Sequence, residues 1–225
     1  MPALIKAKTV ARSGDGSDIS LRAVLSGELG IMDWIAIQAL KGRMFTVNGG
    51  LVTTPVTWTA TATIDITKPA LFGSVPTGKA IIPVSLWLYM EAYGSAALFE
   101  CNAVIGTGGS YTSGMTARTP VCTRSDIGGG SGCTFYEGGN TTVTVGSTAK
   151  INRFWHDGQQ ITITKTTGAA TVSFADPYKF GWSAKTSGEI HIAGPDSQIA
   201  IHQGSQAGTG FVGLTYVEIP SSELP

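Results

Sequence analysis

The sequence predicts an all-β protein, a jelly-roll-like sandwich of two antiparallel sheets with one short N-terminal helix and long Gly-rich loops. Three observations support this prediction. One long segment alternates in hydrophobicity with a period of two, at least seven further short segments have strand character, and Gly, Asn, Asp and Pro turns separate them. Eight or more strands at such spacing are typical of a two-sheet sandwich. The length of 225 residues suits one large β-domain.

The clearest strand lies within Val75–Glu91, after a turn at Pro76–Lys79. Alternate side chains leave a strand in opposite directions, so two faces are expected. One face is predicted to carry Ile82, Val84, Leu86, Leu88 and Met90, and the other Pro83, Ser85, Trp87, Tyr89 and Glu91.

One helix is predicted between Ser26 and Gly42, where apolar residues recur at spacings of three and four. Ser26 can cap its start, and Gly42 can end it. The β-branched residues in this segment leave a buried strand over Ile31–Leu40 as the alternative.

We expect two parts in the chain: an N-terminal arm over residues 1–25 and a single sandwich domain over 26–225. Within the domain, Gly106–Gly139 is rich in glycine and is predicted to form long exposed loops. Turns are predicted at Asn48–Gly50, as a hairpin joining Met44–Val47 to Leu51–Val56, and at His156–Gly158. The other predicted strands are 57–66, 97–105, 141–145, 160–164, 171–174, 189–192, 198–202 and 211–219.

The composition argues against several functional classes. With 15 basic and 15 acidic residues the formal net charge is zero, which argues against nucleic acid as a partner. No apolar run reaches the roughly 20 residues of a membrane span, and no secretion signal is recognised near the N-terminus. Cys101, Cys122 and Cys133 contain no C-x-x-C pair, so reduced thiols are expected.

No motif predicts an enzyme, a cofactor or a metal site. Gly208–Gly213 has the spelling of a dinucleotide-binding loop, but the strand-like L-T-Y-V-E-I follows it in place of a helix. His191 and His202 are predicted on the two arms of a hairpin, with too few neighbouring ligands for a metal. His156-Asp157 lacks the serine elbow that a hydrolase triad would need.

Five tryptophans are present, and aromatic faces can stack on sugar rings. Trp58 and Trp87 lie in strand interiors and are predicted to be core residues. Trp155 and Trp182 lie near predicted turns and are the candidates for glycan contact.

Four segments together resemble virion proteins of tailed bacteriophages: I-M-D-W-I-A-I-Q-A-L-K-G-R-M-F, V-T-T-P-V-T-W, V-P-T-G-K-A-I-I-P-V-S-L-W-L-Y-M-E and T-Y-V-E-I-P-S-S. The likeness covers most of the chain outside Gly106–Gly139. It implies a jelly-roll protein on the capsid exterior or tail, in the virion and as a trimer, and it carries over no functional residues.

The leading hypothesis is a capsid decoration or cement protein that bridges major capsid subunits, with low charge favouring close-fitting interfaces. Its expected contact residues are Leu4, Ile5, Ile19, Leu21, His191 and His202.

The alternative is a tail-associated receptor-binding module that recognises host glycans. Its expected contacts are Tyr111 and Tyr136 in the Gly-rich loops, with Trp155 and Trp182. A third hypothesis, a cupin-like enzyme on the same architecture, would require clustered His and Glu ligands.

Overall fold

The computed structural model describes residues 33–58, 63–93, 98–126, 129–138, 143–144, 146, 150–160, 178–204 and 208–224. The chain divides into two units between Ile37 and Gln38, and the second unit contains both large sheets. Leu4, Ile5, Ile19 and Leu21, four of the predicted contact residues, lie outside the described residues. So does the predicted strand 171–174.

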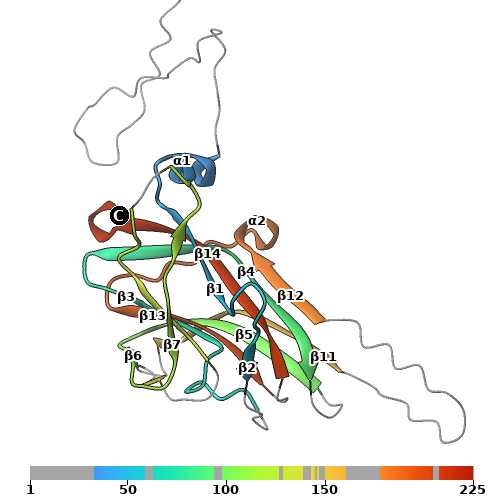
Figure 1. The fold of residues 1–225 in the computed structure, drawn as a ribbon. Helices are drawn as coiled ribbons and strands as arrows, with labels where there is room; N and C mark the ends of the chain where they lie inside the picture. The colour runs from blue at the N-terminus through green and yellow to red at the C-terminus, as the bar shows by residue number, and fades with distance from the viewer. Residues whose placement is uncertain are drawn as a thin grey trace, which may run out of the picture. The chain divides into compact units, whose positions relative to one another are not determined.

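Two six-stranded antiparallel sheets form the sandwich (Figure 1). The first sheet has the order β12-β4-β14-β1-β8, with β2 also paired to β14, and the second has the order β11-β5-β13-β3-β9-β7. The first sheet contains β1 (Met44–Gly49), β2 (Val56–Trp58), β4 (Lys79–Tyr93), β8 (Val121–Cys122), β12 (Tyr178–Ser183) and β14 (Gly208–Pro220). The second contains β3 (Leu71–Val75), β5 (Leu98–Thr107), β7 (Thr116–Arg118), β9 (Thr134–Glu137), β11 (Asn152–Gln160) and β13 (Ser197–Gly204).

The eight principal strands pair in a nested order. The first pairs with the last, β1 with β14, and the pairs β3–β13, β4–β12 and β5–β11 follow inward along the chain. A long antiparallel ribbon that is rolled up across two sheets gives this order, which is that of a jelly roll. The predicted fold class is therefore confirmed.

Apolar side chains from the facing sides of the two sheets form the main core. Trp58, Leu86, Leu88 and Tyr216 from the first sheet, and Phe99 from the second, are each at most 1% exposed. All five belong to one packed cluster. Ring contacts contribute to it, since the tilted rings of Phe135 and Tyr216 have centroids 5.2 Å apart.

A β-bulge in β4 changes which of its side chains face the core. Tyr216 pairs with Pro83 and Thr215 with Ser85, so Val84 is an extra residue without a partner. Leu86, Leu88 and Met90 share one face as predicted, and that face enters the main core, but before the bulge Ile81 does so in place of Ile82. Ile82 and Val84 pack instead in a separate cluster with Ala80, Val217 and Ile219, so their predicted face is wrong.

The described residues of 106–139 form more regular structure than the predicted exposed loops. They contribute β7, β8, β9 and β6 (Ser110–Tyr111), which pairs with β10 (Val143–Thr144). Met115, Phe135 and Cys133 from this segment are buried. A second apolar cluster forms where Met115 and Val143 cover Phe72, Val104 and Ala200.

Two predicted turns are wrong because long-range strand pairing replaces them. Leu51 bridges Thr54 in a tight turn of its own, and β1 pairs with β14 and β8, so no hairpin joins Met44–Val47 to Leu51–Val56. His156–Gly158 lies inside β11 and pairs with β5. Asp157 still accepts a local hydrogen bond from the Gly158 N–H at 2.8 Å, the interaction that favours a turn in isolation.

Helix α1 covers Trp34–Leu40, within the predicted helix, and the alternative strand over Ile31–Leu40 is wrong. The Asp33 side chain accepts a hydrogen bond at the start of the helix, since the Ile35 N–H donates to Asp33 Oδ1 at 3.2 Å. Gly42 adopts a φ of 68° after the last turn, as predicted for the terminator. Two one-turn helices complete the described structure, α2 (Ala184–Ser187) and the 3₁₀ helix η2 (Ser221–Glu223).

Candidate ligand-binding site

The outer face of the first sheet carries three aligned rows of side chains. Cross-strand pairing defines them, because residues directly opposite each other lie on the same face about 5 Å apart. From β12 towards β1 the rows are Lys179, Tyr89 and Phe211; Gly181, Trp87, Gly213 and Asn48; and Ser183, Ser85, Thr215 and Thr46. The row of Tyr89 and Phe211 is therefore aromatic, the middle row has the single large ring of Trp87 between two glycines, and the third row carries only hydroxyl side chains. The three rows lie side by side.

Trp87 lies at the centre of this face. An ideal Cβ on Gly213 would come within 2.5 Å of indole atoms Cε2 and Nε1, so the ring rests on the bare backbone of β14. On the other side of Trp87, Gly181 of β12 also lacks a side chain, and the space above it stays open. Trp87 was predicted as a core residue. That prediction is wrong, because β4 presents its even-numbered residues to the core on this side of the bulge.

A groove of about 650 Å³ lies between Trp87 and the β12 edge. We call it the β12 groove. Its lining combines rings, hydroxyls and one cation: Ser85, Trp87, Tyr89, Lys179, Gly181, Ser183 and Thr186, together with Leu86 and Trp182. Helix α2 contacts β4 and β12 at one end of the groove (Figure 1), and the Ser183 hydroxyl lies 2.8 Å from that of Thr186.

A second, smaller hollow of about 300 Å³ lies on the opposite side of Trp87, towards β1. We call it the β1 hollow, and its lining is residues 48–52 with Trp87 and Phe211. Phe211 stacks on Tyr89 with ring centroids 6.5 Å apart. Leu51 and Val52 at its rim are 56% and 99% exposed. Trp87 is thus shared by two hollows on one face.

This arrangement suits a ligand with an apolar ring face and polar edges. The rings supply flat apolar area, and the Ser and Thr hydroxyls can donate and accept hydrogen bonds. Lys179 is the only charged residue in the lining of either hollow. It makes no ion pair with a described residue.

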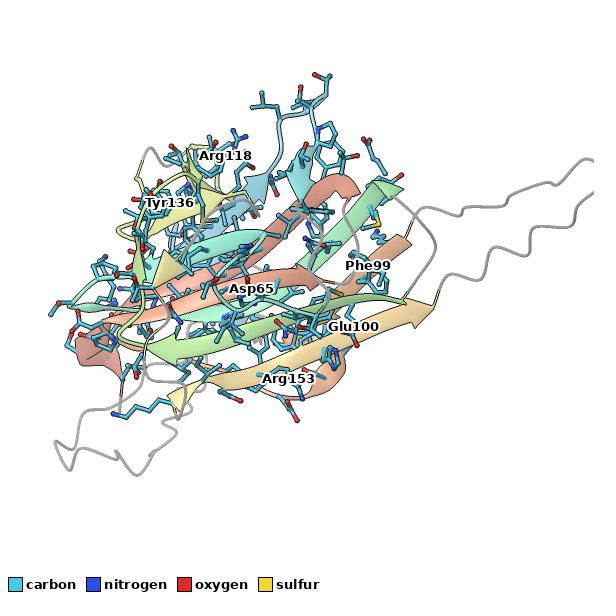
Figure 2. All side chains as sticks on the ribbon, turned by 90° about the horizontal axis from the view of Figure 1, so that it is seen from below. Asp65, Phe99, Glu100, Arg118, Tyr136 and Arg153 are labelled. Atoms are coloured by element: carbon cyan, nitrogen blue, oxygen red, sulfur yellow. The ribbon has the colours of Figure 1, made fainter. Side chains whose placement is uncertain are left out.

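Tyr111 and Tyr136, the predicted glycan contacts of the Gly-rich segment, lie elsewhere. Their rings stack on each other at a centroid distance of 3.9 Å, and both pack against the second apolar cluster. The Tyr111 hydroxyl donates to the Met115 carbonyl at 3.1 Å. Figure 2 shows Tyr136 near Arg118, away from Arg153 on β11. The structure brings the two tyrosines together, but as partly buried packing residues.

Trp155 and Trp182, the other predicted glycan contacts, are only 8% and 9% exposed and belong to the main core. Their proximity to predicted turns suggested exposure, but β11 and β12 continue through both positions. Of the pair, Trp182 also borders the β12 groove.

The two predicted contact histidines occupy different environments. Residues 189–192 form no strand, and His191 lies 5.0 Å from the ring of Phe154 and 3.1 Å from Glu189 Oε2. His202 lies in β13 and is 1% exposed, with Nδ1 3.0 Å from Asn102 Oδ1 and Nε2 3.1 Å from the Ile66 carbonyl. The predicted hairpin is therefore wrong, and His202 has no surface with which to contact a partner.

Two buried carboxylates tie loops to the sandwich. Glu218 accepts hydrogen bonds from Lys79 Nζ at 2.8 Å, from the Ser131 hydroxyl at 2.5 Å and from the Gly132 N–H at 3.0 Å. Burial raises the pKa of Glu218, but these hydrogen bonds together outweigh burial and hold that pKa below its ordinary value.

Glu137 forms the second tie. It accepts hydrogen bonds from Arg118 and from the Gly50 N–H, and so connects β7 and β9 to the end of β1.

Within the described ranges, no group of three or more His, Cys, Asp or Glu side chains lies together as a metal site would require. In the same ranges, no helix is long and apolar enough to cross a membrane.

The groove could not be found by local sequence reasoning. Its signal is the alignment of Trp87 with Gly213 and Gly181, which are 126 and 94 positions away in the chain. Only the strand register places the three in one row.

Comparison of this chain with protein-family models, with curated proteins and with solved structures gave no match. The resemblance to tailed-phage virion proteins therefore stays a hypothesis.

Proposed function

We propose that this protein is a non-catalytic carbohydrate-binding β-sandwich, acting as a receptor-binding module of a tailed-phage particle. The observation that supports the binding activity is the Trp87 indole, which lies on Gly213 beside an open groove edged with hydroxyls. A pyranose ring has a C–H face that stacks on an aromatic ring and a rim of hydroxyls that require hydrogen-bond partners. The groove offers both.

Other ligands with flat rings fit the site less well. Nucleic acid would need several cations for its phosphates, and the lining offers only Lys179. Proline-rich peptides also bind aromatic grooves, so they are the competing ligand in the test. The jelly-roll architecture itself is shared by lectin and capsid domains, which makes it compatible with the proposal at the level of fold only.

A glycan array followed by calorimetric titration tests the proposal. Trp87→Ala should weaken glycan binding by about 2 kcal/mol or more, the cost typical of a central aromatic anchor. Gly181→Val should also abolish binding, because the new side chain would occupy the β12 groove while Trp87 stays in place.

Gly158→Val is the matched control for Gly181→Val. Both glycines are exposed strand residues, and a Cβ would lie 3.1 Å from the Phe99 carbonyl at position 158 and 3.3 Å from the Leu86 carbonyl at position 181. Gly158 lies on β11 of the second sheet, so G158V should bind as the wild type does. The proposal is wrong if the wild-type protein binds no glycan, if it binds only proline-rich peptides, or if W87A binds glycans normally.

A second candidate is the capsid decoration role, as a homotrimer bound to the major capsid protein. Ile190 and Ile192, beside the predicted contact residue His191, are 74% and 45% exposed, and such apolar residues favour a protein interface. Light scattering should give the mass of a trimer for the wild type and of a smaller species for the double variant I190S/I192S. A monomeric wild type would contradict the trimer.

A further inference from the structure

We infer that the ligand is an extended acidic polysaccharide that crosses Trp87, with a carboxylate-bearing sugar in the β12 groove beside Lys179. This inference rests on the proposed carbohydrate-binding function and adds the length and the charge of the ligand. Two observations carry it independently. Hollows lie on both sides of the same indole, and their linings contain a single charged residue.

The extended length follows from the position of Trp87 between the hollows. The β12 groove and the β1 hollow share Trp87 as a wall. The strands that bear them run in the order β12-β4-β14-β1, so the two ends of the site are three strand spacings apart, about 14 Å. One sugar ring cannot reach both hollows at once. A chain of several linked sugars can stack one ring on Trp87 and place its neighbours on either side.

The acidic character follows from the charges around the groove. Lys179 lies at the β12 edge, opposite Tyr89, and no carboxylate of the described residues lines either hollow. Glu91, the nearest acidic residue along β4, is exposed beyond the lining. An ammonium group at the end of a hydroxyl-lined groove attracts an anion, and the carboxylate of a hexuronic acid is the acidic group that sugar chains commonly carry.

The remaining lining has a consistent role in this arrangement. Ser183 and Thr186 lie at the α2 end of the groove, and Ser85 lies in the neighbouring row of hydroxyls. Lys179 and Ser183 are four residues apart on β12, about 13 Å, so these hydroxyls can bond a neighbouring sugar of the chain while Lys179 meets the carboxylate. Leu51 and Val52 extend the apolar rim on the other side of the indole, where a further sugar of the chain would lie.

Calorimetric titration of the full chain with oligomers of a hexuronic acid tests the inference, with neutral hexose oligomers of equal length as the comparison. The uronate tetramer should bind at least tenfold more tightly than the dimer, and more tightly than the neutral tetramer. Lys179→Gln should weaken uronate binding by about two- to fivefold at low salt, as expected for one exposed ion pair, and should weaken neutral binding by a smaller factor. Added salt should weaken uronate binding by the wild type by the same factor, because it screens the Lys179–carboxylate attraction.

The double variant L51S/V52S tests the second hollow. It should remove the gain in affinity from dimer to tetramer and weaken dimer binding by a smaller factor. Equal affinity for uronate and neutral oligomers would overturn the acidic assignment, and equal affinity for dimer and tetramer would overturn the extended one, while carbohydrate binding itself would stand. Absence of binding to every oligomer and to the glycan array would overturn the proposed function as well.

Discussion

Gly213 lies directly beneath Trp87, with space for a hydrogen atom but not for a methyl group between them. A Cβ at position 213 would approach the indole to 2.5 Å, a distance that real structures do not tolerate. Because Gly213 has no side chain, the indole ring contacts the backbone of β14 directly. The pairing of β14 with β4 places the two residues opposite each other.

Gly213→Ala should displace the Trp87 ring from its position. The strand itself accepts alanine, since Gly213 has no positive φ, so the cost arises from the overpacked ring and should be about 1–3 kcal/mol of unfolding free energy. Glycan affinity should fall by about tenfold or more, as for loss of an anchor. Tryptophan fluorescence and titration measure the two effects. An unchanged emission spectrum together with unchanged affinity would show that the ring does not rest on Gly213.

Removing the buried carboxylate of Glu218 should destabilise the protein far more than removing its charged partner. Glu218→Ala leaves the Ser131 hydroxyl and the Gly132 N–H without their acceptor, at an expected cost of about 2–4 kcal/mol. Lys79→Ala should cost less than about 1 kcal/mol, because its side chain is 40% exposed and Glu218 keeps its other two donors. Urea unfolding of both variants gives the comparison. Equal losses would mean that the ion pair, and not the loop hydrogen bonds, stabilises this region.

Only one of the three thiols should react with a disulfide reagent in the folded protein. Burial, and next the charge of Asp157, raises the pKa of Cys101, while burial and Glu218 raise the pKa of Cys133 to about 12, so neither forms the reactive thiolate at pH 8. Cys122 is only partly buried. Absorbance at saturation should report one thiol per chain in buffer and three in urea. Cys122→Ser should abolish the native reaction, and continued reaction in C122S would place a second thiol at the surface.

The fold class was predictable from sequence because period-two alternation is local. The two faces of β4 are the instructive exception. Pro83, a proline inside a central strand, is the one local sign of a bulge beside Val84. Period-two alternation alone does not show that this one extra residue moves Ile82 out of the main core and Ile81 into it. Alternation predicts that a strand exists, whereas its register with β14 decides which side chains are buried.

The same reasoning explains why the candidate site was misplaced. Local cues pointed to tryptophans near turns and to tyrosines in a Gly-rich segment, but Trp155 and Trp182 are buried by strands that continue through the predicted turns. The groove depends on glycines from distant strands that meet at Trp87. Glu218 was likewise invisible, because no local pattern shows that the Ser131–Gly132 loop folds over it.

The environment of His202 predicts a specific loss of stability in mild acid. Burial lowers its pKa from 6.5 to about 4, against the opposing effects of the Ile66 carbonyl and the charge of Asp65. Between these two values the unfolded chain binds a proton that the folded protein does not. The contribution of His202 is therefore fully present above pH 6.5 and is lost as the pH falls towards 4, by about 3 kcal/mol in total.

Urea unfolding at pH 7 and at pH 4.5 measures this loss, and His202→Gln should reduce the difference between the two conditions because the titrating group is gone. His156→Gln, which changes an exposed histidine on β11, is the matched control and should retain the wild-type difference. Asp65 and Glu218, whose pKa values lie below their ordinary ones, also lose stabilisation in acid, but chiefly below about pH 4.5, since their unfolded values lie at 3.8 and 4.5. If H202Q and the wild type lose the same stability between pH 7 and pH 4.5, the His202 ring is not held neutral by burial.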